Sequence, residues 1–202
     1  MMWWWPAIGL GLVTGLGHAF EPDHLAAVST IVAERPGPKQ AATAGLLWGL
    51  GHAGMLLVTG SLLIAAQVTM SSHVRGKLEL VVALMLIALG IRSLLRSVRP
   101  KATRHHDHTG RPLLVGSLHG LAGSGALTAA ALSSVSSPLM ACLYIACFGF
   151  GATLGMASTA GVMGFPLSHV ARSSEGAGWL MRISGFASLA IGGFWAVSSL
   201  QS

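Results

Sequence analysis

GHAFEPDHLAAVST, residues 17–30, is the stretch that decides how this chain is organised. It lies within a long apolar, glycine-rich run that predicts a buried helix. Four ionisable side chains nevertheless fall within seven residues, and a helix-breaking proline stands among them: His18, Glu21, Pro22, Asp23 and His24. A pattern of this kind needs an explanation that packing alone does not provide.

The composition predicts an all-α integral membrane protein. Of the 202 residues, 52% are hydrophobic and only 9% are charged, whereas about a quarter of a soluble domain is charged. Several apolar runs approach twenty residues, the length that crosses a bilayer. The net charge of +6 comes from basic residues between these runs. Cationic loops at one membrane face explain that charge, and we expect no nucleic-acid partner.

Six membrane spans are predicted. Turn or charge signals separate them, among them AERPGPKQ, SSHVRGK and RPKATRHHDHTGRP. The N-terminus MMWWWPAIGL lacks the cationic start of a secretory signal, so Trp3, Trp4 and Trp5 are interpreted as an interfacial anchor on a retained first helix. The six spans are expected at about residues 5–31, 41–69, 78–98, 112–132, 138–166 and 177–200.

The two halves of the chain resemble each other when the sequence is shifted by about 100 residues. GLGHAFEPDHLAA (15–27) aligns with GSLHGLAGSGALT (116–128), WGLGHAGM (48–55) with FGFGATLG (148–155), and IALGI (87–91) with LAIGG (189–193). Three spans per half force the second copy to enter the membrane upside down. We therefore expect a 3+3 inverted repeat: residues 1–98, a loop at 99–111, and residues 112–202. Such repeats are typical of secondary transporters.

The distribution of Lys and Arg predicts the orientation. The loops after the first, third and fifth spans share one side, which holds most of the basic residues, while the other side holds only Arg75 and Lys77. The positive-inside rule places the basic side in the cytoplasm and both termini outside.

The proline gives the first span its expected geometry. On an unbroken helix, Asp23 and His24 would point about 140° and 240° around the axis from His18. Pro22 has no N–H for the carbonyl of His18, and its ring pushes against that turn. We therefore expect a broken or kinked helix in which these three side chains converge. Hydrogen bonding between helices is the alternative interpretation.

Two further histidines fall in apolar spans. His52 lies in WGLGHAG, and Gly45 and Gly49 before it form a small-residue face. Gly11 and Gly15 form a similar face on the first span. We expect these two faces to pack together and to bring His52 towards His18. Across the predicted two-fold axis, the fourth span contributes His119, which precedes GLAGSG.

Imidazoles with one carboxylate predict a site for a late first-row divalent metal: nickel, cobalt, zinc or copper. The candidate ligands are His18, Asp23, His24, His52 and His119. Glu21 is expected to orient a ligand or to stand at the mouth of the site. Each histidine has a simpler alternative role, as a hydrogen-bonded core residue.

The third loop contains a second cluster of histidines. KATRHHDHTG holds His105, His106, Asp107 and His108. These residues either chelate metal at the cytoplasmic face or form a solvated polar linker.

His18-x4-Asp23-His24 within a membrane span resembles the signature of the nickel/cobalt transporter family. LLWGLGHAGMLLVTG and LHGLAGSGALTAAAL look similar to its UreH-type, urease-accessory branch. The resemblance implies a high-affinity Ni²⁺ or Co²⁺ permease in the cell membrane, with His18, Asp23 and His24 essential to recognition and His52 beside them. By this resemblance the chain is expected to lack the outermost spans of larger relatives, and FGFGATLGMASTAG has no acidic residue where those relatives have an Asp/Thr-rich motif.

The energetics favour uptake over export. The sequence has no Gly-Lys-Ser/Thr phosphate loop, so we expect no ATP hydrolysis. A divalent ion gains roughly 4.6 kcal/mol on entering a cell at about 100 mV. Export needs coupling, and Glu79 is the only other acid that we expect near a span. The alternatives are efflux, a non-transporting accessory protein for nickel-enzyme maturation, with a cytoplasmic metallochaperone as partner, and an intramembrane metalloenzyme with Glu21 as base.

Overall fold

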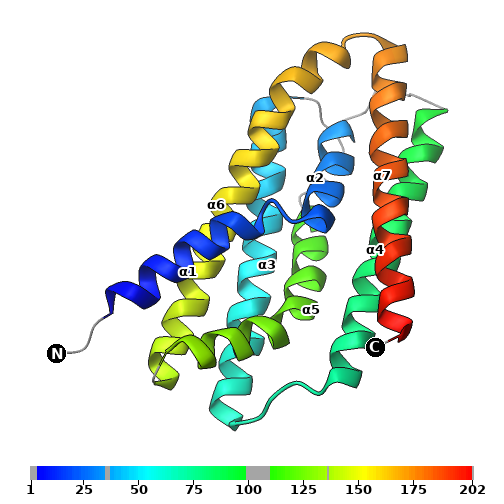
Figure 1. Ribbon diagram of the computed structural model, residues 1–202. Coiled ribbons are helices and arrows are strands. Elements are labelled where there is room, and N and C mark those ends of the chain that lie inside the picture. The colour runs from blue at the N-terminus through cyan, green and yellow to red at the C-terminus, as the bar shows by residue number, and fades with distance from the viewer. Residues whose placement is uncertain (1–3, 35–36, 99–109, 136, 202) are drawn as a thin grey trace.

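The computed structural model describes residues 4–34, 37–98, 110–135 and 137–201. Every regular element in these ranges is an α-helix. The helices are arranged as an elongated bundle (Figure 1). Their bounds are α1 Trp5–His18, α2 Pro22–Glu34, α3 Pro38–Ala66, α4 Ser72–Ser97, α5 Gly110–Ser134, α6 Pro138–Val170 and α7 Ser174–Gln201.

Five of the described helices, α3 to α7, are long and apolar enough to cross a membrane. They match the second to sixth predicted spans. The first predicted span, 5–31, is instead divided into α1, of 14 residues, and α2, of 13 residues. At about 1.5 Å per residue each reaches only about 20 Å, short of the ~30 Å hydrocarbon core. Neither helix crosses a bilayer alone, and Figure 1 places their junction well inside the bundle.

Local signals explain where several helices begin and end. Pro38 and Pro138 stand at the first turns of α3 and α6, where a missing N–H has no cost. The Ser137 hydroxyl caps α6 by accepting from the Met140 amide at 3.2 Å. Gln67 ends α3 in the left-handed conformation, with φ of 55°.

Glycine allows α3 and α6 to approach the other half of the chain closely. A Cβ on Gly51 of α3 would overlap the backbone carbonyl of Leu113 in α5. In the same way, a Cβ on Gly151 of α6 would overlap the backbone carbonyl of Leu12 in α1. Both contacts are backbone against backbone, so they require glycine.

The packing of α4 on α7 has the same reciprocal form. A Cβ on Gly90 of α4 would lie 3.0 Å from the amide nitrogen of Leu189 in α7. A Cβ on Gly192 of α7 would lie 3.1 Å from the amide nitrogen of Ile87 in α4. The two helices lie side by side at one edge of the bundle (Figure 1).

The expectation that the glycine faces of the first and second spans meet each other is wrong. Gly11 and Gly15 of α1 pack on the backbone of α6 at Tyr144 and Phe148, and Gly45 and Gly49 of α3 pack on α6 further along. Both faces therefore use α6 as their common partner. A small-residue face predicts close contact, but it does not identify the helix that approaches.

The outside of the bundle is apolar, as lipid exposure requires. Large hydrophobic side chains such as Leu62, Phe165 and Phe194 are mostly exposed, whereas Trp48 and Met156 are fully buried. Trp4 and Trp5, two of the three predicted anchors, are exposed at the start of α1. Trp3 lies outside the described residues.

Candidate metal centre

The centre is built around the junction between α1 and α2. His18 is the last residue of α1 and Pro22 the first of α2. The carbonyl of His18, which Pro22 cannot satisfy, accepts from the Glu21 amide at 3.1 Å. The chain thus turns within three residues and starts a new helix with a new direction.

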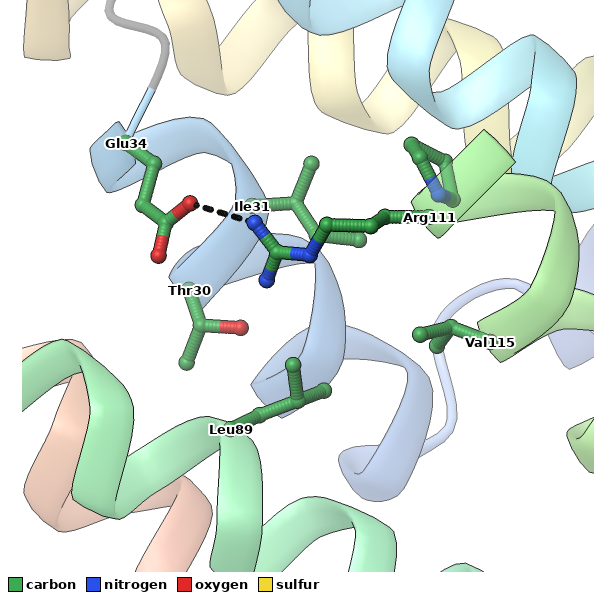
Figure 2. A pocket seen from close by; sticks show the side chains of 7 residues that line it. Thr30, Ile31, Glu34, Leu89, Arg111 and Val115 are labelled. Atoms are coloured by element: carbon green, nitrogen blue, oxygen red, sulfur yellow. Dashed lines mark hydrogen bonds and ion pairs between the residues drawn. The ribbon is translucent and has the colours of Figure 1, made fainter. Parts of the chain in front are cut away.

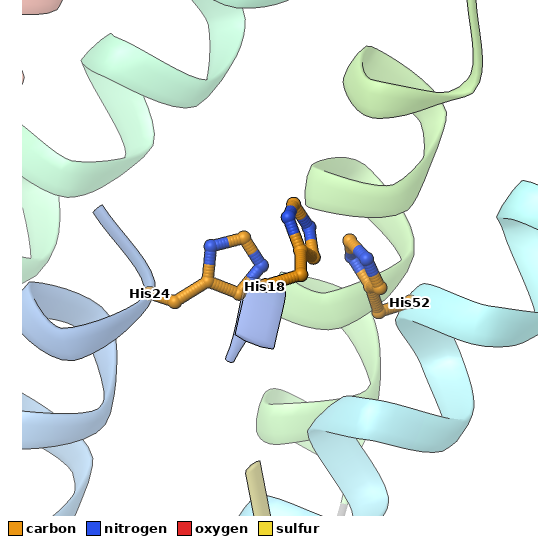
Figure 3. Close-up of side chains that lie close together, drawn as sticks. All are labelled: His18, His24 and His52. Carbon is orange, nitrogen blue, oxygen red and sulfur yellow. The ribbon is translucent and has the colours of Figure 1, made fainter. Parts of the chain in front are cut away.

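Three imidazoles converge at this junction, one each from α1, α2 and α3 (Figure 3). The ring centroids of His18 and His24 lie 4.4 Å apart, and those of His18 and His52 lie 5.3 Å apart. The His24 and His52 centroids are 5.2 Å apart. One nitrogen from each ring lies within 4.8 Å of the others, which is close enough to share an ion.

A second group of three shares His24 with the first. His119 of α5 donates from Nε2 to Asp23 Oδ2 at 2.9 Å. Asp23 Oδ1 accepts from the His24 amide at 2.9 Å and lies 3.1 Å from His24 Nδ1. Potential ligand atoms of Asp23, His24 and His119 also lie within 4.8 Å of one another. The structure therefore brings all five predicted ligands into one cluster.

The carboxylates determine which imidazole nitrogens are free to bind a metal. An ionised carboxylate can only accept a hydrogen bond, so His24 Nδ1 carries the proton that faces Asp23. Glu21 lies 2.7 Å from His18 Nδ1 and acts on that ring in the same way. On both rings the lone pair is then left on Nε2. A carboxylate that orients an imidazole in this manner is usual behind a metal ligand.

Several buried nitrogens of the cluster have no hydrogen-bond partner. These are His24 Nε2, His119 Nδ1 and both ring nitrogens of His52. His24 and His52 are fully buried. An unsatisfied buried polar group costs about 1–3 kcal/mol, so four such atoms in one place favour a ligand over simple core packing. The donor set of imidazoles with a carboxylate fits a late divalent ion, and neither Cys142 nor Cys147 belongs to it.

One side of the cluster faces the surface. The side chain of Glu21 is 51% exposed and that of His18 is 18% exposed, while His24 behind them is sealed. An ion arriving from outside the bundle would meet the Glu21 carboxylate and His18 first. The position of Glu21 is compatible with both of its predicted roles, at the mouth and behind a ligand.

Two aromatic rings that the sequence analysis did not select enclose the cluster. The Trp48 ring lies 5.2 Å from His24 and 6.0 Å from His119, and the Phe148 ring lies 5.0 Å from His18. These two residues occupy equivalent positions in the aligned WGLGHAGM and FGFGATLG stretches. That correspondence was a signal that could have identified them.

Two other predictions have different outcomes. Glu79 is not the only other acid near a span, because Glu34 ends α2 and is mostly buried. The histidine loop with His105, His106, Asp107 and His108 lies outside the described residues, which resume at Gly110.

Comparison with known proteins gives one strong relationship. The chain is 35% identical over 198 residues to the urease accessory protein UreH of Bacillus sp. (strain TB-90). The alignment covers 91% of this chain and 87% of that protein. No family model matches the chain. No solved structure matches it. This degree of identity over nearly the whole of both sequences shows that the chain belongs to the UreH-type branch of the nickel/cobalt transporter superfamily.

Proposed function

We propose that this protein carries Ni²⁺, or Co²⁺, across the inner membrane into the cell. The observation that supports this most directly is the buried cluster of imidazoles with unpartnered nitrogens at the break between α1 and α2. Family membership supports a role in nickel supply, because the similar protein is named a urease accessory protein.

The ion is proposed to bind between His18, His24 and His52. One nitrogen from each ring lies within 4.8 Å of the others, and the Asp23 and Glu21 carboxylates each lie beside Nδ1 of one ring. Asp23, His24 and His119 form an alternative position next to it, reached by a small movement of the ion. Neutral imidazoles bind metals, so binding should release protons and weaken in acid.

An inverted repeat is the proposed scaffold for transport. Contacts between the halves recur with the partners exchanged: Gly51 on Leu113 corresponds to Gly151 on Leu12. The reciprocal contacts between α4 and α7 fit the same two-fold relation. Because the closest helix contacts join the two halves, the proposed motion is a rearrangement of helix groups drawn from both halves, which would expose the central cluster to one side at a time.

The basic residues support the proposed orientation. On α4, Arg75 and Arg92 are 17 residues apart, about 26 Å along the helix. Arg92, Arg96 and Arg111 gather at one end of the bundle around Glu34. We place that end in the cytoplasm, with both termini outside and the loop 99–111 facing a metallochaperone.

The membrane potential supplies enough energy for uptake, since a divalent ion gains roughly 4.6 kcal/mol at about 100 mV. Efflux would need coupled proton movement through the histidines. A non-transporting accessory protein would bind the ion without flux. In an intramembrane metalloenzyme Glu21 would be the base, but its carboxylate is already 2.7 Å from His18 Nδ1.

Flux measurements in proteoliposomes distinguish these functions. We expect nickel accumulation driven by an inside-negative potential, and its loss in His52→Ala, whose ring makes no hydrogen bond that folding would miss. His73→Ala, an exposed histidine at the start of α4, is the matched control and should transport normally. Nickel binding without flux would support the accessory role instead, and flux that runs only outwards with a proton gradient would support efflux.

A further inference from the structure

The C-terminal end of α2 carries a second charged cluster, separate from the histidines. Glu34 accepts from Arg92 Nε at 3.0 Å and from Arg111 Nη1 at 3.1 Å, and Arg96 Nη1 forms an ion pair with its carboxylate at 3.1 Å. Arg92 and Arg96 come from α4, and Arg111 comes from α5. The Glu34 side chain is only 12% exposed, whereas each arginine is between 36% and 38% exposed.

The charges in this cluster do not balance. Three guanidinium groups surround one carboxylate, so the cluster has a net charge of +2, three minus one. Each guanidinium has five N–H donors, and a single carboxylate offers about four acceptor sites. Glu34 can therefore satisfy only a minority of the donors, and among the described residues no other carboxylate pairs with these arginines.

A partly open groove extends from the charged cluster between α2, α4 and α5. Figure 2 shows Arg111 and Glu34 on its wall together with apolar side chains. Ile31, Leu89 and Val115 line it and are all partly exposed. The groove thus joins a cationic end to an apolar wall.

We propose that this groove binds an anionic phospholipid, with its phosphate at the arginines and an acyl chain along Ile31, Leu89 and Val115. Basic pockets between helices at the cytoplasmic face of a membrane bind anionic head groups. A free inorganic anion would make no use of the apolar wall. A zwitterionic lipid brings its own ammonium group and would leave the +2 charge unbalanced. The proposal requires membrane insertion but not metal transport, so each can fail alone.

Native mass spectrometry of the full-length protein in detergent, titrated with phosphatidylglycerol or phosphatidylcholine, tests this. We expect phosphatidylglycerol to bind more tightly. Arg111→Gln should weaken its binding about fivefold, which corresponds to the ~1 kcal/mol that one basic residue contributes near a charged surface. Arg75→Gln, which removes the same charge at the opposite end of α4, should leave it unchanged.

Two further variants separate a lipid site from a structural ion-pair network. Glu34→Gln raises the net charge of the cluster and should preserve or strengthen phosphatidylglycerol binding. If the ion pairs serve only the structure, Glu34→Gln should weaken phosphatidylglycerol binding as much as Arg111→Gln does. Val115→Phe fills the groove without changing charge and should weaken phosphatidylglycerol binding, even though all three arginines remain.

Several results would overturn the proposal. One is equal affinity for the two lipids. Another is an effect of Arg75→Gln as large as that of Arg111→Gln. A third is binding of inorganic phosphate at the arginines that is unaffected by Val115→Phe, together with no preference for phosphatidylglycerol. Should Arg111→Gln fail to fold, Arg92→Gln removes one charge from the same cluster and is expected to give the same fivefold loss.

Discussion

Replacing Gly51 by alanine tests whether close helix contact sets the geometry of the imidazole cluster. A Cβ at this position would overlap the carbonyl oxygen of Leu113 and lie 3.0 Å from the amide nitrogen of Ser117. Both are backbone atoms of α5, so no side-chain rotation relieves the overlap. Since non-bonded heavy atoms prefer about 3.5–4.0 Å, α3 and α5 must separate by roughly 1 Å.

The separation should lower the free energy of unfolding and should weaken metal binding even more. Overpacking of this kind typically destabilises by about 1–3 kcal/mol, and the better helix propensity of alanine returns at most ~1 kcal/mol. His52 follows Gly51 directly, so its ring moves with α3 away from His119 of α5 and changes its position relative to the other rings of the cluster. Metal sites tolerate ligand displacements of only about 0.2 Å. We therefore expect Gly51→Ala to bind nickel at least tenfold more weakly.

Gly54→Ala is the matched control, because it changes the same residue type in the same helix. A Cβ on Gly54 would meet nothing within 4 Å. This variant should bind nickel normally and be as stable as the parent, or more stable by up to ~1 kcal/mol. Thermal unfolding in detergent and titration calorimetry with nickel measure both quantities. If Gly51→Ala matched Gly54→Ala in both, the reasoning from backbone contact would be refuted.

Three other predictions follow from the same geometry. Gly151→Ala should lower the thermal midpoint about as much as Gly51→Ala, because its Cβ would overlap a carbonyl of α1, and an unchanged midpoint would contradict the reciprocal packing. Asp23→Asn should weaken nickel binding about 10- to 100-fold in calorimetry, since the amide no longer holds both His24 and His119 as a carboxylate does, whereas parental affinity would mean that the carboxylate is dispensable. Nickel binding by the parent should fall steadily as the pH is lowered, because protons compete for the imidazole lone pairs, and a pH-independent affinity would argue against imidazole ligands.

The residues of the candidate centre could be predicted because their chemistry conflicts with their surroundings. Histidines and a carboxylate in apolar runs are costly, so their presence alone indicates a site. Pro22 gave the break between α1 and α2 a local cause, since proline removes a specific hydrogen bond whatever the tertiary structure is. These signals depend on residues that are close in the sequence, so they can be recognised without knowing the fold.

The partners of each helix could not be predicted, because packing depends on contacts between distant segments. Gly11 and Gly45 both indicate a close neighbour, yet only the structure identifies α6 as that neighbour for each. Trp48 was not selected from the sequence, because the contact of its ring with His24 joins two segments that are distant in the chain. Glu34 was overlooked because its three arginines come from two other helices that are distant in the sequence.

The two halves share their packing but not their chemistry, and this difference constrains the proposed mechanism. In the alignment by about 100 residues, Ser124 and Gly125 stand where the first half has Asp23 and His24, and only His119 has a histidine counterpart, His18. A repeat in which both halves kept the full motif would offer two equivalent sites. Here one half supplies nearly all the candidate ligands, and the other joins them through the bond from His119 to Asp23. This bond joins the two halves directly at the candidate site, so it is one contact through which occupancy of the site can influence the position of α5.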